Sequence, residues 1–164
     1  MPTASKEITA GERCLSRLDY KGAFAHFDVA LKEDPKNAYV YFCKAESALG
    51  LNRLDSGEIA ALYKAALDLE PENPQYLDGF ASFCLDIGNF KEAEEVFNRA
   101  ARIDQENAPF YYLDFAVNYY RKAPIIMEKY MDSTTKRIIA KKALDYLLKA
   151  LGMGKEEALE VLRG

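Results

Sequence analysis

The 164-residue sequence has no tryptophan, one histidine and three cysteines, and it lacks any long apolar run. No stretch approaches the roughly 18 consecutive apolar residues of a membrane-spanning helix, so we expect none. The first residues lack the apolar core of a signal peptide, and we therefore expect a cytoplasmic location. Cys14, Cys43 and Cys84 are odd in number and include no Cys-x-x-Cys pair, which argues against a disulfide framework or a zinc site.

Catalytic signatures are scarce as well. His26, the only histidine, lies between Phe24 and Phe27 in a helical pattern. Nothing near it supplies a nucleophile and an orienting acid in a recognisable arrangement. No glycine-rich loop has the spacing of a phosphate-binding motif. We therefore expect a non-enzymatic protein without metal or cofactor, in which His26 is a surface or groove-edge residue.

What the sequence does contain is typical of a folded domain. It is 49% hydrophobic and 29% charged, with 11 tyrosines and 9 phenylalanines. Its net charge of −4 is unevenly distributed: residues 1–120 carry 12 basic and 20 acidic side chains, whereas residues 121–149 carry 8 basic and 3 acidic ones. This distribution indicates two faces of opposite charge.

One short tract recurs along the chain. Residues 34–41 return as residues 70–77 and again as residues 104–111, at offsets of 36 and 34. Self-similarity at this spacing is typical of a repeat architecture. Each tract contains an asparagine that we expect to cap the helix that follows, namely Asn37, Asn73 and Asn107.

The segments around these tracts predict pairs of helices, because their apolar residues recur at steps of three and four. The turn inside each pair is expected near Asp19, near residues 52–57 and at Gly88-Asn89. Asp55 and Glu58 have the spacing of a capping box.

The fourth pair is irregular. Its first helix is expected over residues 108–122, followed by an insertion near 123–136 that is long for a helix–helix connection. Asp132 is the expected N-cap of the next helix. A capping helix is expected over residues 154–163.

These features resemble the tetratricopeptide repeat family, strongly over residues 4–107 and more loosely afterwards. The positions that carry the resemblance are small residues in the first helices and aromatic residues in the second helices, here Gly11, Ala45 and Ala81, and Phe27, Tyr63 and Phe97. The resemblance implies an all-α fold, a right-handed α-solenoid of antiparallel helix pairs. It further implies a single domain over residues 1–164, with repeats at about 4–37, 38–73, 74–107 and 108–151.

The resemblance also implies a concave groove, lined by the first helices, that binds a peptide or helix of a partner protein. The positions that match this lining hold Tyr39, Phe42, Glu46, Asp78, Ser82, Asp86, Tyr112 and Tyr119. The lining is aromatic with acidic spots, so a partner with basic residues among apolar ones is expected. An alternative is a self-associating structural module, in which the segment 123–139 folds back and covers the groove.

One specialisation of the family is not expected in this chain. Some members bind the acidic C-terminal tails of heat-shock chaperones through basic residues on the first helices. The matching positions hold Ile8, Glu12, Cys43, Gln75 and Gly79, none of which is basic. A carboxylate at Glu12 repels an acidic tail.

The basic stretch in the last repeat has two interpretations. Lys136, Arg137, Lys141, Lys142 and Lys149 lie on one amphipathic helix. A solvated basic face is favoured over a surface for nucleic acid or membrane, because the chain as a whole is acidic. We accordingly expect no nucleic acid and no membrane partner, and a monomer or weak homo-oligomer.

Overall fold

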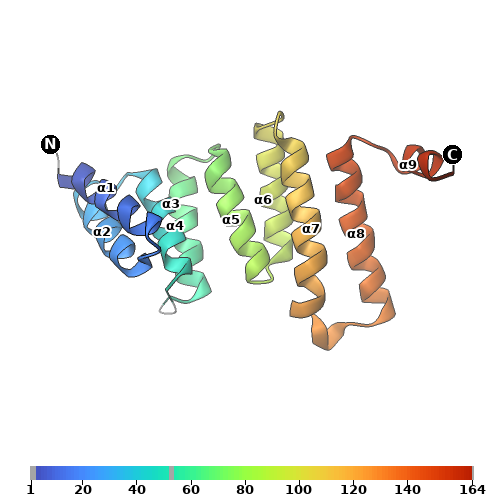
Figure 1. Ribbon diagram of the computed structural model, residues 1–164, viewed down its shortest axis with the longest axis horizontal. Helices are drawn as coiled ribbons and strands as arrows, with labels where there is room; N and C mark the ends of the chain where they lie inside the picture. Colours follow the sequence, from blue (N-terminus) through green and yellow to red (C-terminus); the bar gives the residue numbers. More distant parts are fainter. Residues whose placement is uncertain (1–2, 52–53, 164) are drawn as a thin grey trace. The chain divides into compact units, whose positions relative to one another are not determined.

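The computed structural model describes residues 3–51 and 54–163, and among these residues every regular element is helical (Figure 1). The elements are α1 (Thr3–Ser16), α2 (Tyr20–Glu33), α3 (Ala38–Leu49), α4 (Ser56–Leu69), α5 (Pro74–Asp86), α6 (Phe90–Ile103), α7 (Ala108–Ile126), a 3-10 turn η1 (Glu128–Tyr130), α8 (Ser133–Leu151) and α9 (Lys155–Arg163). Within the described ranges, none of the helices combines the length and the apolar character that a membrane crossing requires.

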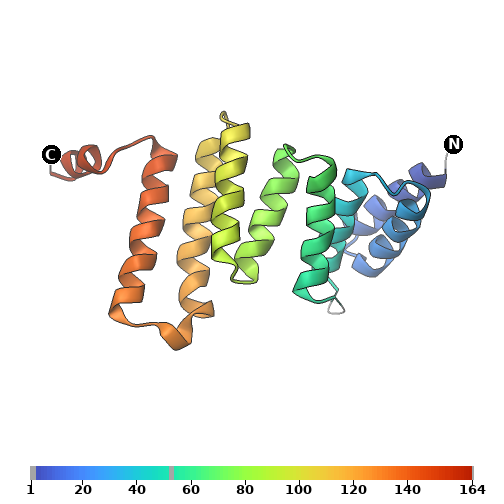
Figure 2. The same ribbon diagram turned by 180° about the vertical axis from the view of Figure 1, so that it is seen from behind.

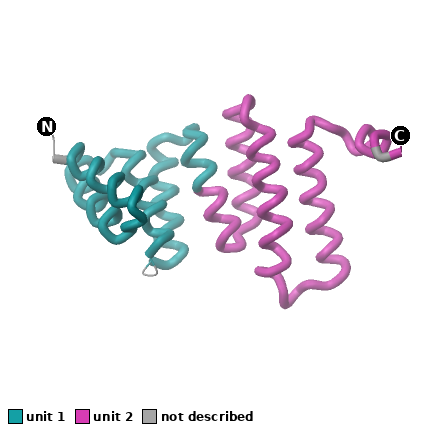
Figure 3. Tube along the Cα trace, viewed as in Figure 1, with its two compact units in different colours: residues 1–79 teal, residues 80–164 magenta. Residues whose placement is uncertain are grey.

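The chain forms two compact units, residues 1–79 (unit 1) and residues 80–164 (unit 2), coloured separately in Figure 3. Helix α5 begins in unit 1 and ends in unit 2. The assignment of residues 1–164 to a single domain, and the right-handed sense of the solenoid, stay predictions.

Unit 1 is built from helix pairs in which α1 packs on α2, α2 on α3 and α3 on α4 (Figures 1 and 2). Phe27 is completely buried. A Cβ at Gly11 would lie 2.6 Å from its ring, so only glycine lets α1 approach α2 this closely. The close packing expected at this pair of positions is therefore confirmed. Lys44 of α3 and Asp28 of α2 form an ion pair of 2.6 Å between neighbouring pairs.

Unit 2 contains two helices that are longer than those of unit 1, α7 and α8. Helix α6 packs on α7 and α7 on α8, and the last two have 19 residues each. The expected end of α7 at Lys122 is wrong, because the helix continues through Pro124 to Ile126. The expected N-cap at Asp132 is confirmed: its carboxylate accepts the backbone N–H of Thr135 at 2.7 Å. Most of the predicted insertion thus lengthens the two helices that flank it.

One hydrogen bond recurs at all three copies of the tract. An acidic residue that ends one helix accepts a hydrogen bond from the side-chain amide of the asparagine three residues later; the pairs are Asp34–Asn37 at 3.1 Å, Glu70–Asn73 at 2.8 Å and Asp104–Asn107 at 3.0 Å. The amide oxygens of Asn37 and Asn73 also accept backbone N–H groups of the next helix, as expected of N-caps. Asn107 occupies the N-cap position of α7, but its side chain makes no cap hydrogen bond.

The turns inside the pairs are closed by local polar groups. Asp19 accepts the N–H of Gly22 at 2.9 Å, and Asp55 and Glu58 form the expected capping box. Asn52 and Arg53, which begin the second predicted turn, lie outside the described residues. Asn89 occupies the N-cap position of α6; its amide donates to Glu92, and its side chain makes no cap hydrogen bond.

Candidate protein-binding site

Three of the predicted groove residues, Tyr39, Phe42 and Glu46, meet in one cleft of unit 1. This aromatic cleft has a volume of about 480 Å³. Its lining comes from α1, α2, α3 and α5 and consists of Leu15, Tyr20, Tyr39, Phe42, Cys43, Glu46, Leu49, Gly50 and Gln75. A fourth predicted residue of this unit, Asp78, is half-buried and lies outside the lining.

Two aromatic side chains that line the cleft, Tyr20 and Phe42, pack directly against glycine residues. A Cβ at Gly50 would lie 2.2 Å from the ring of Tyr20, and one at Gly79 would lie 2.7 Å from the ring of Phe42. Phe42 also stacks on Tyr76 with ring centroids 4.9 Å apart. It is only 7% exposed, so it forms a fixed wall of the cleft, whereas Tyr39 is 38% exposed at the rim.

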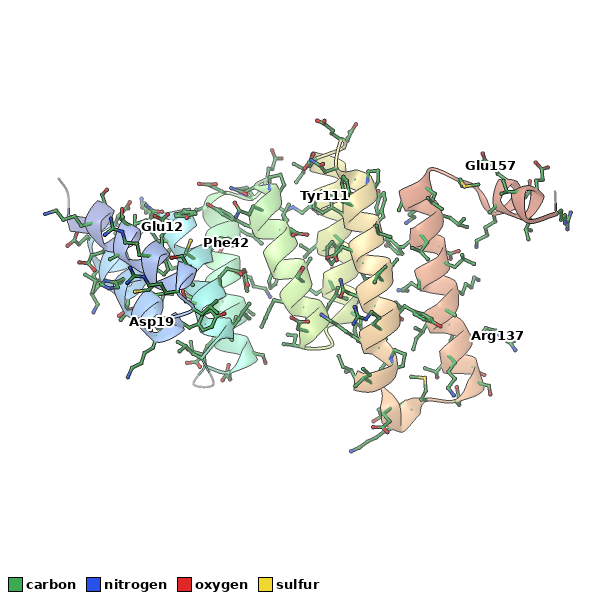
Figure 4. All side chains as sticks on the ribbon, in the orientation of Figure 1. Glu12, Asp19, Phe42, Tyr111, Arg137 and Glu157 are labelled. Carbon is green, nitrogen blue, oxygen red and sulfur yellow. The ribbon has the colours of Figure 1, made fainter. Side chains whose placement is uncertain are left out.

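Two carboxylates give the aromatic cleft its negative charge. The hydroxyl of Tyr39 donates to Glu12 at 2.8 Å, and the hydroxyl of Tyr63 donates to Glu46 at 2.5 Å. Glu12 and Phe42 are labelled on α1 and α3 in Figure 4. Because each tyrosine donates to a single carboxylate oxygen, each carboxylate keeps the capacity to accept from an incoming donor.

The Cys43 thiol and the Tyr39 hydroxyl of the cleft stay protonated near pH 7. Burial raises the pKa of the Cys43 thiol to about 11, and the charges of Glu12 and Glu46 act in the same direction. Burial likewise raises the pKa of Tyr39. A protonated thiol is a poor nucleophile and a poor metal ligand. The cleft therefore presents aromatic surface and carboxylate charge.

His26 lies away from this cleft, between α1 and α2. Its Nδ1 is 2.7 Å from a carboxylate oxygen of Glu7, and both side chains are partly buried. The histidine expected at the surface or groove edge thus links two helices of one pair.

The predicted groove residues of unit 2 have different surroundings. Asp86 is exposed and forms an ion pair with Lys122, and Ser82 is half-buried. Tyr119 is 6% exposed and stacks on Phe115 with ring centroids 5.4 Å apart. Tyr119 belongs to the core of this unit, and a role for it in partner binding stays a prediction.

Tyr112 is half-buried at the edge of the same aromatic cluster. Its ring centroid lies 6.0 Å from that of Tyr146 on α8. The segment expected to fold back over the groove does not do so within unit 2, because it continues α7 and begins α8 (Figure 1). The residues of η1 are exposed, with Tyr130 at 75%.

A second cleft, in unit 2, escaped the sequence reasoning. This lysine cleft has a volume of about 640 Å³ and is lined by Glu94, Ile138, Lys141, Lys142, Asp145, Tyr146, Leu148, Lys149, Met153, Gly154 and Lys155. Residues 138, 141, 142, 145 and 149 are spaced so that they lie on one face of a helix. This spacing is the sequence feature from which the lysine cleft could have been predicted. From the sequence, these lysines were assigned to a solvated basic face together with residues such as Arg137, which extends outward from α8 in Figure 4.

Comparison with known proteins agrees with this architecture. A family model described as tetratricopeptide repeat matches residues 57–113. Residues 57–113 are therefore a tetratricopeptide repeat segment. The all-α repeat solenoid expected from the sequence is confirmed, since solved structures of such proteins share the fold.

Tetratricopeptide repeat structures align over most of the chain. The crystal structure of MamA protein gives a TM-score of 0.63 at 16% identity and covers 92% of this chain and 91% of its own. The TPR2B domain of yeast Sti1, in its complex with pHsp70, gives 0.61 at 15% identity and covers 88% and 98%. At sequence identities this low, the structural similarity shows a shared fold and does not extend to function.

Among curated relatives, human protein arginine N-methyltransferase 9 is 24% identical over 172 residues, which is 98% of this chain and 19% of the human protein. The chain spans about a fifth of the length of the curated relatives it matches.

Proposed function

We propose that this chain is a non-enzymatic adaptor that binds a segment of a partner protein in the aromatic cleft of unit 1. The observation that carries the proposal is the convergence of Tyr39, Phe42 and Glu46 on one concave surface. All three were selected from the sequence as groove positions, and all three line the cleft. The fold supports a protein partner, because one of the structures that share it is a domain in complex with pHsp70.

The chemistry of the cleft favours a partner segment with a basic residue beside apolar ones. Phe42 and Leu15 offer apolar walls, and Tyr39 offers a rigid amphipathic side chain of the kind enriched at binding hot spots. Glu46 within the cleft and Glu12 bonded to Tyr39 complement a lysine or arginine. The same charges disfavour the acidic tails of heat-shock chaperones.

Two features support a binding role over catalysis at this site. The Cys43 thiol stays protonated near pH 7, and Tyr39 and Glu46 each take part in a hydrogen bond with a neighbouring side chain. The methyltransferase named among the relatives matches this chain over only 19% of its length, so its activity is not carried over. A cytoplasmic location and a monomeric or weakly oligomeric state remain part of the proposal.

Capture of partners from native lysate tests the aromatic cleft with matched variants. Tyr39→Ala removes a partly exposed wall, while Tyr130→Ala removes an exposed tyrosine of η1 in the other unit. We expect Tyr39→Ala to lose the captured protein and Tyr130→Ala to retain it, with nearly unchanged thermal transitions for both. Equal capture by the two variants would sink the assignment.

Glu46→Gln then tests the charge preference. It keeps the shape of the side chain and leaves one amide oxygen to accept from Tyr63, but it removes the charge and replaces the second acceptor with a donor. We expect this variant to weaken capture and to reduce its sensitivity to salt. An unchanged salt dependence contradicts a basic partner.

A further inference from the structure

The lysine cleft of unit 2 has an excess of positive charge. Four lysines, Lys141, Lys142, Lys149 and Lys155, face two carboxylates, Glu94 and Asp145, which leaves two positive charges in excess. The sign is opposite to that of the aromatic cleft and to the net charge of the chain.

Two of the four lysines are held by partners. Lys142 forms an ion pair with Glu94, which also accepts the hydroxyl of Tyr146 at 2.9 Å. Lys155 at the start of α9 lies 2.8 Å from Asp145 of α8. These contacts connect α6, α8 and α9 and define the walls of the cleft.

The other two lysines, Lys141 and Lys149, are exposed, so their ammonium groups can reach a ligand. Among the residues that the structure describes, neither Lys141 nor Lys149 forms an ion pair. The Lys149 ammonium lies 4.2 Å from the ring centroid of Tyr146 and 5.7 Å from that of Tyr112. These rings position the ammonium without neutralising it.

The floor of the lysine cleft includes apolar residues. Ile138, Leu148 and Met153 contribute to the lining beside Tyr146. Ile138 is 57% exposed, so its side chain is open to a ligand. Because Ile138 precedes Lys141 along α8 and Met153 follows Lys149, a ligand that suits this surface carries negative charges flanked by apolar groups.

We propose that the lysine cleft binds a short acidic segment of a protein, with carboxylates paired to Lys141 and Lys149 and separate apolar side chains against Ile138 and Met153. A peptide fits better than a nucleic acid, because the lining contains no arginine to form the bidentate contacts that phosphates favour. The apolar floor has no counterpart in a phosphate backbone, and the acidic chain as a whole repels a polyanion.

Direct binding to a defined probe tests this proposal. The probe is a fluorescent synthetic peptide rich in glutamate with isolated leucines, and the readout is anisotropy at low and physiological salt. We expect Lys141→Gln/Lys149→Gln to weaken binding roughly fivefold, since each substitution removes one exposed ion pair. The matched control Lys91→Gln/Lys129→Gln makes the same change of net charge at exposed positions elsewhere in unit 2 and should bind like the parent.

Several outcomes overturn the proposal. Equal weakening by both double variants means that the peptide responds only to net charge. Tighter binding of a single-stranded oligonucleotide or of phosphatidylserine vesicles assigns the surface to another class of ligand. Salt-sensitive self-association that disappears with Lys141→Gln/Lys149→Gln assigns it to a second copy of this chain.

Two further variants keep the result interpretable. Lys141→Gln alone changes a side chain without an ion pair, so it should keep the parent's thermal transition and still weaken binding. Tyr39→Ala should leave acidic-peptide binding unchanged, which separates this inference from the function proposed for the aromatic cleft. Loss of acidic-peptide binding in Tyr39→Ala contradicts an independent lysine cleft.

Discussion

Helices α3 and α7 are both rich in aromatic residues, yet they use them in opposite ways. In the first three repeats the close-approach position of the first helix holds Gly11, Ala45 or Ala81. The equivalent position in α7, 34 residues after Ala81, holds Phe115. Phe115 is completely buried, and its ring centroid lies 4.5 Å from that of Tyr146 on α8.

The contrast shows what one large residue does at a position that otherwise holds a small one. In unit 1, Phe42 and Tyr39 are left at an open cleft. In unit 2, the ring of Phe115 packs against those of Tyr119 and Tyr146. Tyr119, a predicted groove residue, therefore belongs to the core. The two units share repeat chemistry and present different surfaces.

The largest expected effect comes from removing the residue that creates this contrast. Phe115→Ala leaves a cavity among buried rings and should lower the free energy of unfolding by about 3–5 kcal/mol. Urea denaturation measures the loss, and hydrogen exchange locates it. We expect faster exchange in α7 and α8 and unchanged partner capture by the aromatic cleft. A loss below about 1 kcal/mol contradicts the role assigned to Phe115.

The next effect concerns a tyrosine hydroxyl of unit 2. Tyr146 donates to Glu94 and also accepts from Asn98 at 2.5 Å. Tyr146→Phe should therefore cost about 2 kcal/mol. Thermal and urea melts measure the loss, and a loss below about 0.5 kcal/mol contradicts the polar network assigned to this hydroxyl.

A smaller effect concerns two equivalent turns. Leu18 has φ of 59° and Gly88 has φ of 77°, at positions 70 residues apart. Leu18 is 71% exposed, so Leu18→Gly relieves strain without loss of buried surface and should stabilise the protein by about 0.5–1 kcal/mol.

The matched change at the other turn has the opposite sign. Gly88→Ala introduces the strained backbone, and its Cβ would lie 2.8 Å from Ile126. It should destabilise the protein by about 1–2 kcal/mol. Effects of the same sign at both turns refute their equivalence.

The smallest expected effect is a dependence on alkaline pH. Burial raises the pKa of Tyr146 to about 12, above the ordinary value of 10.0. The fold thus favours the neutral hydroxyl: this stability is fully present below pH 10 and is lost as the pH rises towards 12. Absorbance titration of tyrosine should show a late component that Tyr146→Phe removes. Identical titrations of the two proteins contradict a buried, bonded hydroxyl.

Local sequence rules predicted the regular part of the molecule well. The tract spacing located the joints, and Asp55 and Asp132 cap their helices as expected, because capping depends on residues within one turn. Asn89 and Asn107 also occupy N-cap positions, but neither side chain accepts a backbone N–H group of the helix that follows.

The site was predicted less completely, for a physical reason. Tyr39, Phe42 and Glu46 converge because they follow the register of regular repeats. Tyr119 keeps the same spacing, but its surroundings are set by the contact of α7 with α8, which no local pattern encodes. The lysine cleft depends on Glu94, Tyr146 and Lys155 from three different helices, so its shape follows only from tertiary packing.

The acid–asparagine joints at residues 34–37, 70–73 and 104–107 have a consequence for how such a chain changes over generations. Each of these amide–carboxylate bonds begins and ends within the same four residues. A duplication or deletion of one whole repeat at a joint therefore preserves the bond on both sides of the new boundary. The number of repeats can change in single genetic steps without redesign of any loop, while the surfaces carried by the individual repeats diverge separately.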